Sequence, residues 1–154
     1  MEIKELVRRP NIEQNKKLNS AYTQLNTLLT ELKKRDLNEK IVNSINKRID
    51  QINAGSESEK AYRKQIRKTQ SSILKSIESE LKLVTKNHYR NTWLAIGMAV
   101  FGIPLGAAFG ASMGNMGLLG IGLPIGMAIG IAVGSGMDKK ALETGRQLNF
   151  EVKF

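Results

Sequence analysis

Few residues of this chain have the chemistry that catalysis or metal binding requires. The 154 residues include no cysteine and one histidine, His88, so thiolate sites and disulfides are excluded. The scattered carboxylates do not combine with His88 into a ligand set, and no nucleophile stands beside a base in a suitable context. The glycines lack the Gly-Lys-Ser/Thr of a phosphate-binding loop. The sequence therefore predicts a non-enzymatic protein with no metal and no cofactor.

Positive charge is the other chemical resource of the chain. Residues 1–91 hold 20 Lys and Arg against 11 Asp and Glu. Such an excess attracts either nucleic acid or anionic lipid headgroups. Interleaved acids, evenly spread lysines and the lack of a groove-reading motif argue against nucleic acid. We expect solvated faces, together with a set of headgroup and interfacial residues that flank an apolar block. These residues are Lys82, Lys86, Tyr89, Arg90, Trp93, Lys139 and Lys140.

The uncharged block, residues 92–137, is built on one motif used twice. The pattern G-[IL]-P-[IL]-G-x-A-[FI]-G-x-[AS]-[MV]-G begins at Gly102 and again at Gly122. Glycine at every fourth position places bare backbone along one side of a helix, which lets another helix approach closely in lipid. The pattern predicts eight helix-packing glycines: Gly102, Gly106, Gly110, Gly114, Gly122, Gly126, Gly130 and Gly134.

The block divides into two expected membrane spans, about 92–113 and 117–137, joined by a tight turn at Asn115. Each span has about 21 residues, enough to cross a hydrocarbon core of about 30 Å at 1.5 Å per residue. Basic residues flank both outer ends and the turn is uncharged, so both termini should be cytoplasmic and the turn external. The N-terminus also lacks the apolar core of a secretory signal. We expect a protein of the bacterial inner membrane, in contact with the lipid bilayer.

Two features of the spans leave alternatives open. The stripe of the first span extends backwards to Ala95 and Ala99, and further small residues flank it. A helix that is small on more than one side favours homo-oligomers, whereas packing of the two stripes on each other would make an inert anchor. Pro104 and Pro124 each free a carbonyl of the preceding turn, so they are candidate kinks, although prolines are also simply tolerated in such helices.

The cytoplasmic half has a clear helical period. Apolar residues recur every three or four positions, which predicts three helices at about 11–34, 37–53 and 57–90. We expect capping motifs at Asn11, Asp36 and Ser56 to mark the helix starts. The narrow apolar stripes suit a coiled coil or thin bundle, closed within one chain or paired between chains. The third helix is long enough to run toward the membrane.

The tail, residues 138–154, begins with a polar stop, Asp138-Lys139-Lys140. Apolar residues then alternate at positions 148, 150, 152 and 154. This alternation is typical of a short strand or of a docking peptide that adds to a sheet edge, and a frayed tail is the alternative.

These parts together predict an all-α membrane protein: a cytoplasmic helical bundle or coiled coil (1–91), a transmembrane hairpin (92–137) and a cytoplasmic tail (138–154). With the doubled motif and the polar stop, residues 92–146 resemble the small bacterial glycine-zipper membrane proteins, which share the twin hairpin but no common function. One helix also resembles the Gly/Ala-striped pore helices of small-conductance mechanosensitive channels, although the prolines depart from that pattern.

Two functional hypotheses follow. The favoured one is a homo-oligomeric pore, or channel, that permeabilises the inner membrane, with the cytoplasmic helices as its assembly or gating element. The alternative is a membrane-anchored adaptor whose cytoplasmic helices or tail bind partner proteins. The small residues on more than one side of the helix favour the first hypothesis, because leucine would serve a simple anchor equally well. The two prolines, which lie at similar depth counted from the external turn, favour it too. The basic third helix and the tail favour the second.

Overall fold

The computed structural model describes residues 2–10, 12–55 and 58–152. As predicted, the chain is all-α. It forms two compact units, one made of Met1–Val84 with Leu148–Phe154 and the other of Thr85–Gln147. We call the first unit the bundle and the second the hairpin, and each is described by itself.

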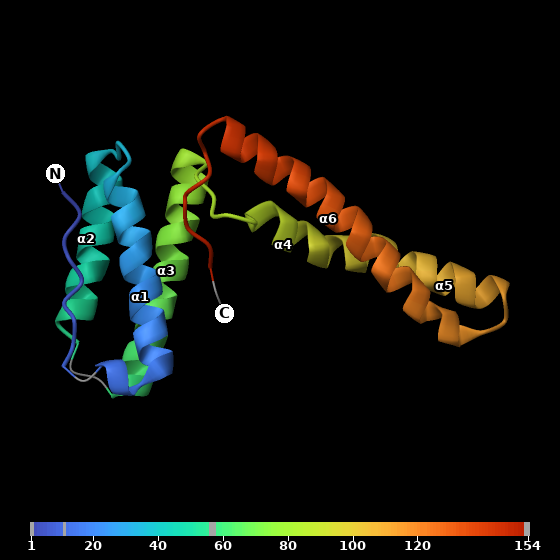
Figure 1. Ribbon diagram of the computed structural model, residues 1–154, viewed down its shortest axis with the longest axis horizontal. Helices are drawn as coiled ribbons and strands as arrows, with labels where there is room; N and C mark the ends of the chain where they lie inside the picture. The colour runs from blue at the N-terminus through green and yellow to red at the C-terminus, as the bar shows by residue number, and fades with distance from the viewer. Residues whose placement is uncertain (1, 11, 56–57, 153–154) are drawn as a thin grey trace. The chain divides into compact units, whose positions relative to one another are not determined.

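Three helices, α1 (Lys16–Lys33), α2 (Glu39–Asn53) and α3 (Glu59–Leu81), lie side by side in the bundle (Figure 1). A short 3-10 turn, Ile12–Gln14, precedes α1. The predicted apolar stripes face inward and form a core of leucine and isoleucine, including Leu25, Ile49 and Ile66. Burial of such side chains is the main driving force for folding in water. The core closes within a single chain.

Asparagine side chains fix the starts of two helices. The Asn15 side chain accepts the Leu18 N–H at 3.1 Å, and the Asn38 side chain accepts the Ile41 N–H at 2.9 Å. These bonds satisfy amide groups that have no partner inside the helix. The predicted cap at Asp36 is therefore wrong by two residues. The other two predicted starts, Asn11 and Ser56, lie outside the described residues.

The helix expected over 57–90 is interrupted. The helix α3 ends at Leu81, and Lys82 follows in a left-handed conformation with φ of 56°. Asn87, also left-handed with φ of 57°, precedes the next helix. Between them, Val84 is buried. Neither glycine nor proline marks this break, and lysine seldom adopts a left-handed conformation, so the sequence pattern did not reveal it.

Two extended segments complete the bundle, and the sequence stripes missed the first of them. The N-terminal segment lies along α2 and buries Ile3 and Leu6 in the core. The C-terminal tail buries Leu148 and Phe150 in the same core. The predicted alternation of the tail is present, because Asn149 between them is exposed. Its apolar side packs on the chain's own helices rather than on a sheet edge.

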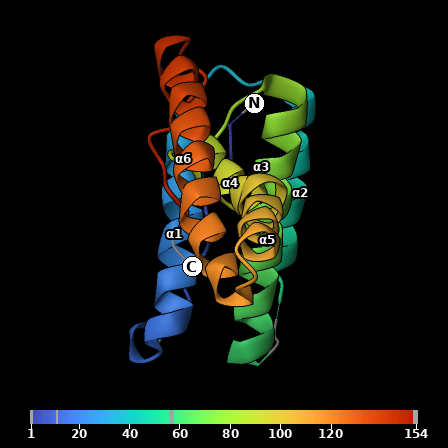
Figure 2. The same ribbon diagram turned by 90° about the vertical axis from the view of Figure 1, so that its right-hand side faces the viewer.

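The hairpin contains α4 (His88–Gly97), a π-helical turn (Met98–Gly102), α5 (Ile103–Ser112) and α6 (Leu119–Glu143). A 3-10 turn, Met116–Leu118, leads into α6. Figures 1 and 2 both show α6 running alongside α4 and α5. The helical stretches exceed the predicted spans at their charged ends, beginning at His88 and ending at Glu143.

Candidate functional site

Glycines make the closest contacts between the two arms of the hairpin. Four glycines on each arm are buried: Gly97, Gly102, Gly106 and Gly110 on one, and Gly122, Gly126, Gly130 and Gly134 on the other. A β-carbon added to Gly126 would lie 2.5 Å from the backbone nitrogen of Gly102. One added to Gly134 would lie 2.5 Å from the Cα of Arg90. No side chain fits there, so backbone packs on backbone.

The position of Gly97 depends on the π-helical turn. The Ile103 N–H bonds the carbonyl of Met98, five residues earlier, so this turn holds one residue more than an α-helical turn. Pro104 follows directly, and its ring would clash with a carbonyl of a regular helix at this point. The extra residue shifts the phase of the helix, so Gly97 is buried while Ala95 and Ala99 are exposed. The predicted backward extension of the stripe through those alanines is therefore wrong.

Two further residues of the motif have other positions. Gly114 lies in the turn with φ of 62°, and nothing lies within 4 Å of where its β-carbon would be. It serves the chain reversal, for which a left-handed residue is needed, and not the helix contact. Pro124 lies inside α6, which continues through it. The two prolines thus have unlike surroundings, since only Pro104 follows a π-helical turn.

Asp138 continues the glycine column of α6, four residues after Gly134. The residue is 7% exposed, and its side chain accepts the Tyr89 N–H at 3.1 Å and the Arg90 N–H at 2.9 Å. These amides belong to the first turn of α4, where a negative charge is favourable and free N–H groups need acceptors. The residue predicted only as part of a polar stop therefore caps the opposite arm. Its four-residue distance from Gly134 was the available signal.

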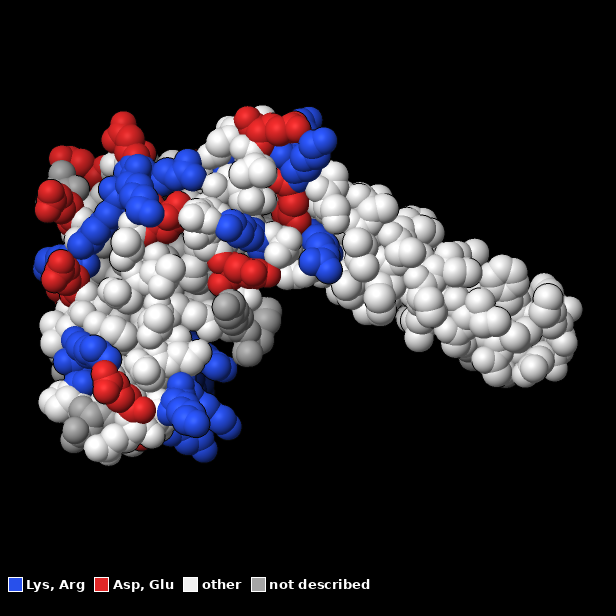
Figure 3. Space-filling model, viewed as in Figure 1, with Lys and Arg blue, Asp and Glu red and all other residues white. Residues whose placement is uncertain are grey.

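Outside the glycine interface, the hairpin presents apolar side chains. Exposed members include Val100, Ile103, Met113 and Ile121. Figure 3 shows no blue or red over most of the hairpin, with charges gathered at one end. Two helices, His88–Ser112 and Gly120–Glu143, are long and apolar enough to cross a membrane, and only 22% of the most apolar stretch of each is buried. A core helix of a soluble protein would be mostly buried.

The five basic members of the predicted set of headgroup residues are exposed. Lys82 lies just after α3 in the bundle, and the other four cluster at the charged end of the hairpin: Lys86, Arg90, Lys139 and Lys140. The two aromatic residues, Tyr89 and Trp93, are half-buried in the first two turns of α4. The Tyr89 ring meets the His88 ring edge-on, with centroids 5.1 Å apart.

The tail is held on the bundle by a carboxylate. Leu148 donates its N–H to the Val84 carbonyl at 2.8 Å, and Asn149 donates its N–H to Glu31 Oε1 at 3.2 Å. Glu31 is 8% exposed and also pairs with Lys34 at 3.1 Å. Burial alone would raise the pKa of Glu31, but the hydrogen bonds from Lys34 and Asn149 and the nearby positive charges outweigh burial and lower it. The anion is therefore the form that holds the tail.

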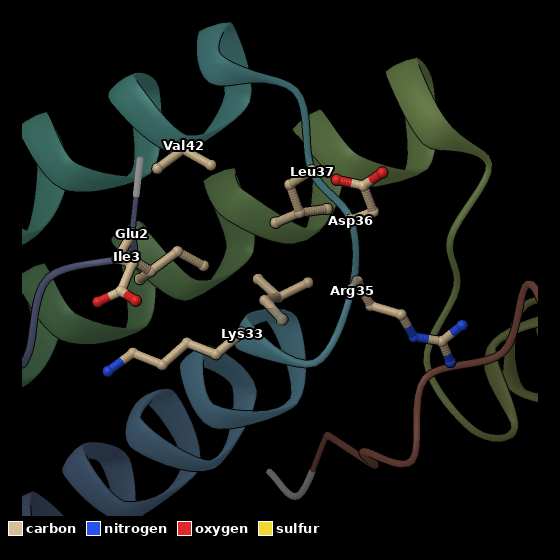
Figure 4. Close-up of a pocket in the computed structure, with 8 residues that line it drawn as sticks. Glu2, Ile3, Lys33, Arg35, Asp36, Leu37 and Val42 are labelled. Carbon is tan, nitrogen blue, oxygen red and sulfur yellow. The ribbon is translucent and has the colours of Figure 1, made fainter.

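One pocket of about 300 Å³ opens at the connection between α1 and α2 (Figure 4). Four charged residues of both signs line it: Glu2, Lys33, Arg35 and Asp36. The Lys33 and Arg35 side chains extend away from each other, so their charges do not converge on one anion (Figure 4). Within the described residues, no group of three His, Asp or Glu is placed to hold a metal ion.

No protein-family model, curated protein or solved structure matches this chain. The resemblance to small glycine-zipper membrane proteins therefore rests on the sequence motif alone.

Proposed function

We propose that the protein is a membrane-anchored scaffold. The hairpin is a two-helix anchor in the bacterial inner membrane, and the bundle is a cytoplasmic, non-enzymatic module that binds partner proteins. The observation that carries this proposal is the glycine interface of the hairpin. The two glycine columns pack on each other within one chain. They are therefore not available for contacts between chains, which were the reason for favouring an oligomeric pore from the sequence.

The surface of the hairpin supports the anchoring role. In lipid, every backbone N–H and C=O needs an internal partner, and helices provide this. The apolar side chains that the glycine interface leaves outside would contact the acyl chains. The basic cluster at one end, with Tyr89 and Trp93 beside it, has the composition of a cytoplasmic membrane boundary. Both termini would then be cytoplasmic and the turn at Asn115 external.

Single-cysteine labelling tests this arrangement, since the chain has no cysteine of its own. A cysteine at Asn115 should react with an impermeant maleimide in intact bacterial spheroplasts. Cysteines at Ser20 and Thr144, which are also exposed in the structure, should react only after permeabilisation. Labelling of Ser20→Cys in intact spheroplasts, or recovery of the wild-type chain in the soluble fraction, would overturn the anchor.

A homo-oligomeric pore is the second candidate, favoured by a small-residue column on the opposite side of α6. Its four small members, Gly120, Ala128, Ala132 and Gly136, are all exposed, and Pro124 lies in the same column. Such a column would allow close contact between hairpins. Liposomes that hold purified protein at high density separate the two functions. The scaffold leaves an entrapped dye inside, whereas the pore releases it, and Gly136→Leu should then reduce the release.

A further inference from the structure

One face of α3 concentrates positive charge. With 3.6 residues per turn, five exposed cations fall within an arc of about 100° around the helix. These residues, which we call the cationic face, are Lys60, Lys64, Arg67, Lys68 and Lys75. Ile66 and Ile73, which enter the core, lie on the opposite side of the helix. No acidic residue occurs between Lys60 and Ile77. The face is therefore a nearly continuous row of positive charge.

The cationic face is not neutralised by the rest of the described chain. None of its five side chains forms an ion pair with a described acidic residue, whereas Lys4 pairs with Asp50 of α2 at 2.8 Å. Lys60, Lys64 and Lys68 follow one another at intervals of four residues, and like charges at this spacing destabilise a helix. Negative charge from outside the chain would relieve this repulsion.

The charges of the three helices are segregated within the bundle. The helix α1 packs beside α3 and begins with two cations, Lys16 and Lys17, but has no acidic residue before Glu31. In contrast, α2 mixes its cations with Glu39 and Asp50. The bundle thus has a basic side, formed by α3 with α1, and a helix of mixed charge.

Two short connections join the bundle to the hairpin. Three residues separate Val84, which is buried in the bundle, from the start of α4 at His88. Four residues separate the end of α6 at Glu143 from Leu148, which is buried in the bundle as well. The shorter connection spans about 14 Å at most when fully extended. If the hairpin is in the membrane, the bundle therefore meets lipid headgroups at a high effective concentration, which no soluble partner shares.

We propose that the cationic face docks the bundle onto anionic phospholipids of the cytoplasmic leaflet. This inference rests on the proposed membrane anchor, which brings the two surfaces together. Each Lys or Arg close to an anionic leaflet strengthens such binding about fivefold. Lysine suits this role, because its flexible stem lets the charge follow headgroups that have no fixed positions. Docking through α3 leaves α2 accessible to the protein partners of the scaffold.

Energy transfer between a dye on the bundle and acceptors on lipid headgroups tests the docking in the full-length chain. The dye is attached to Ser71→Cys, at the centre of the cationic face, or to Asn43→Cys on the exposed side of α2 as a control. The protein is placed in lipid nanodiscs of phosphatidylcholine, alone or mixed with phosphatidylglycerol. We expect transfer from position 71 to exceed transfer from position 43 only in the mixed discs. This difference should vanish at about 1 M salt, where charges are screened beyond about 3 Å.

Two charge variants separate the cationic face from net charge. The first combines Lys64→Gln, Arg67→Gln and Lys68→Gln on the face. The second removes the same charge from α2 and combines Lys40→Gln, Lys47→Gln and Arg48→Gln. The first should lower the ratio of docked to free bundle by about a hundredfold, at about fivefold per cation, and the second should change it little. Both should keep the helical circular dichroism, since none of these side chains belongs to the core.

The single tryptophan, Trp93, reports the anchor separately. Lipids brominated on their acyl chains should quench its emission whenever the hairpin is inserted, and unquenched emission would contradict the anchor. With Trp93 quenched, equal transfer from position 71 in both kinds of disc overturns the docking, as does an equal loss in both charge variants. A response of the Ser71 dye to polyglutamate or to a DNA duplex, with none to phosphatidylglycerol, would assign the cationic face to a soluble partner and overturn it too.

Discussion

The bundle and the hairpin are both helical, but opposite kinds of residue close their interiors. The bundle buries branched side chains such as Ile66 and Ile73 and exposes charge. The hairpin buries bare backbone, as at Gly126, and exposes branched side chains such as Ile103. In water, the burial of apolar area favours association of helices. In lipid that force is absent, so close backbone contact has to replace it.

This difference between the two interiors determines which substitutions each unit can tolerate. A core of side chains is damaged by removing atoms, which leaves cavities. An interface of glycines is damaged by adding atoms, because there is no space for them. The same reasoning sets the order of the expected effects.

The largest effect is expected from a side chain placed inside the glycine interface. Gly126→Leu should force the arms apart to the roughly 8–10 Å between helices with ordinary side chains. Gly136→Leu is the matched control, since nothing lies within 4 Å of that site. Spin labels at the exposed residues Val100 and Val133 report the distance between the two arms by pulsed electron paramagnetic resonance spectroscopy. Equal distances in both variants would contradict the glycine interface.

The bundle should respond to the opposite change. Ile66→Ala removes a fully buried side chain and should lower the free energy of unfolding by about 2–5 kcal/mol. Val7→Ala, at a side chain that is 60% exposed, should stay within about 0.5 kcal/mol of wild type. Guanidinium unfolding in detergent, followed by the loss of helical circular dichroism, measures both. A small effect of Ile66→Ala would mean that the core is loosely packed.

A smaller effect is expected at the helix cap of the hairpin. Asp138→Ala removes the acceptor for the Tyr89 and Arg90 amides and should cost about 0.5–2 kcal/mol. Glu143→Ala, at an exposed carboxylate near the end of α6, is the control. Hydrogen exchange at the two amides should accelerate only in the Asp138 variant. Unchanged exchange there would show that the cap contributes nothing.

The smallest effect is the pH dependence of tail docking. The pKa of Glu31 is lowered in the folded chain, so its anion stabilises the docked tail. That contribution is fully present above the ordinary glutamate pKa and is lost as the pH falls through the lowered value. Hydrogen exchange at the Asn149 amide should therefore speed up at acidic pH. Glu31→Gln should remove this pH dependence, and an identical pH profile in the variant would assign it to another group.

The periodic features of both units were predictable from the sequence. Apolar residues spaced three and four apart located α1, α2 and most of α3, and the doubled motif located the two long apolar helices. These signals are local, because a helix repeats every 3.6 residues whatever lies beside it. Docking of the N-terminal segment gives no such local signal. It depends on Asn46 and Asn53, which lie more than forty residues away in the sequence.

Local patterns in the sequence were sufficient to predict most of the helical residues and the apolar stretch. Tertiary packing decided three features that these patterns do not encode. The π-helical turn before Pro104 adds one residue to a turn of the first arm and so shifts the phase of the helix. Gly97 is therefore buried in the interface, whereas Ala95 and Ala99 are exposed. The left-handed Lys82 ends α3 early, and Asp138 caps a helix almost fifty residues away. A phase shift, a chain break and a distant cap each depend on what packs opposite, and a local repeat carries no record of that.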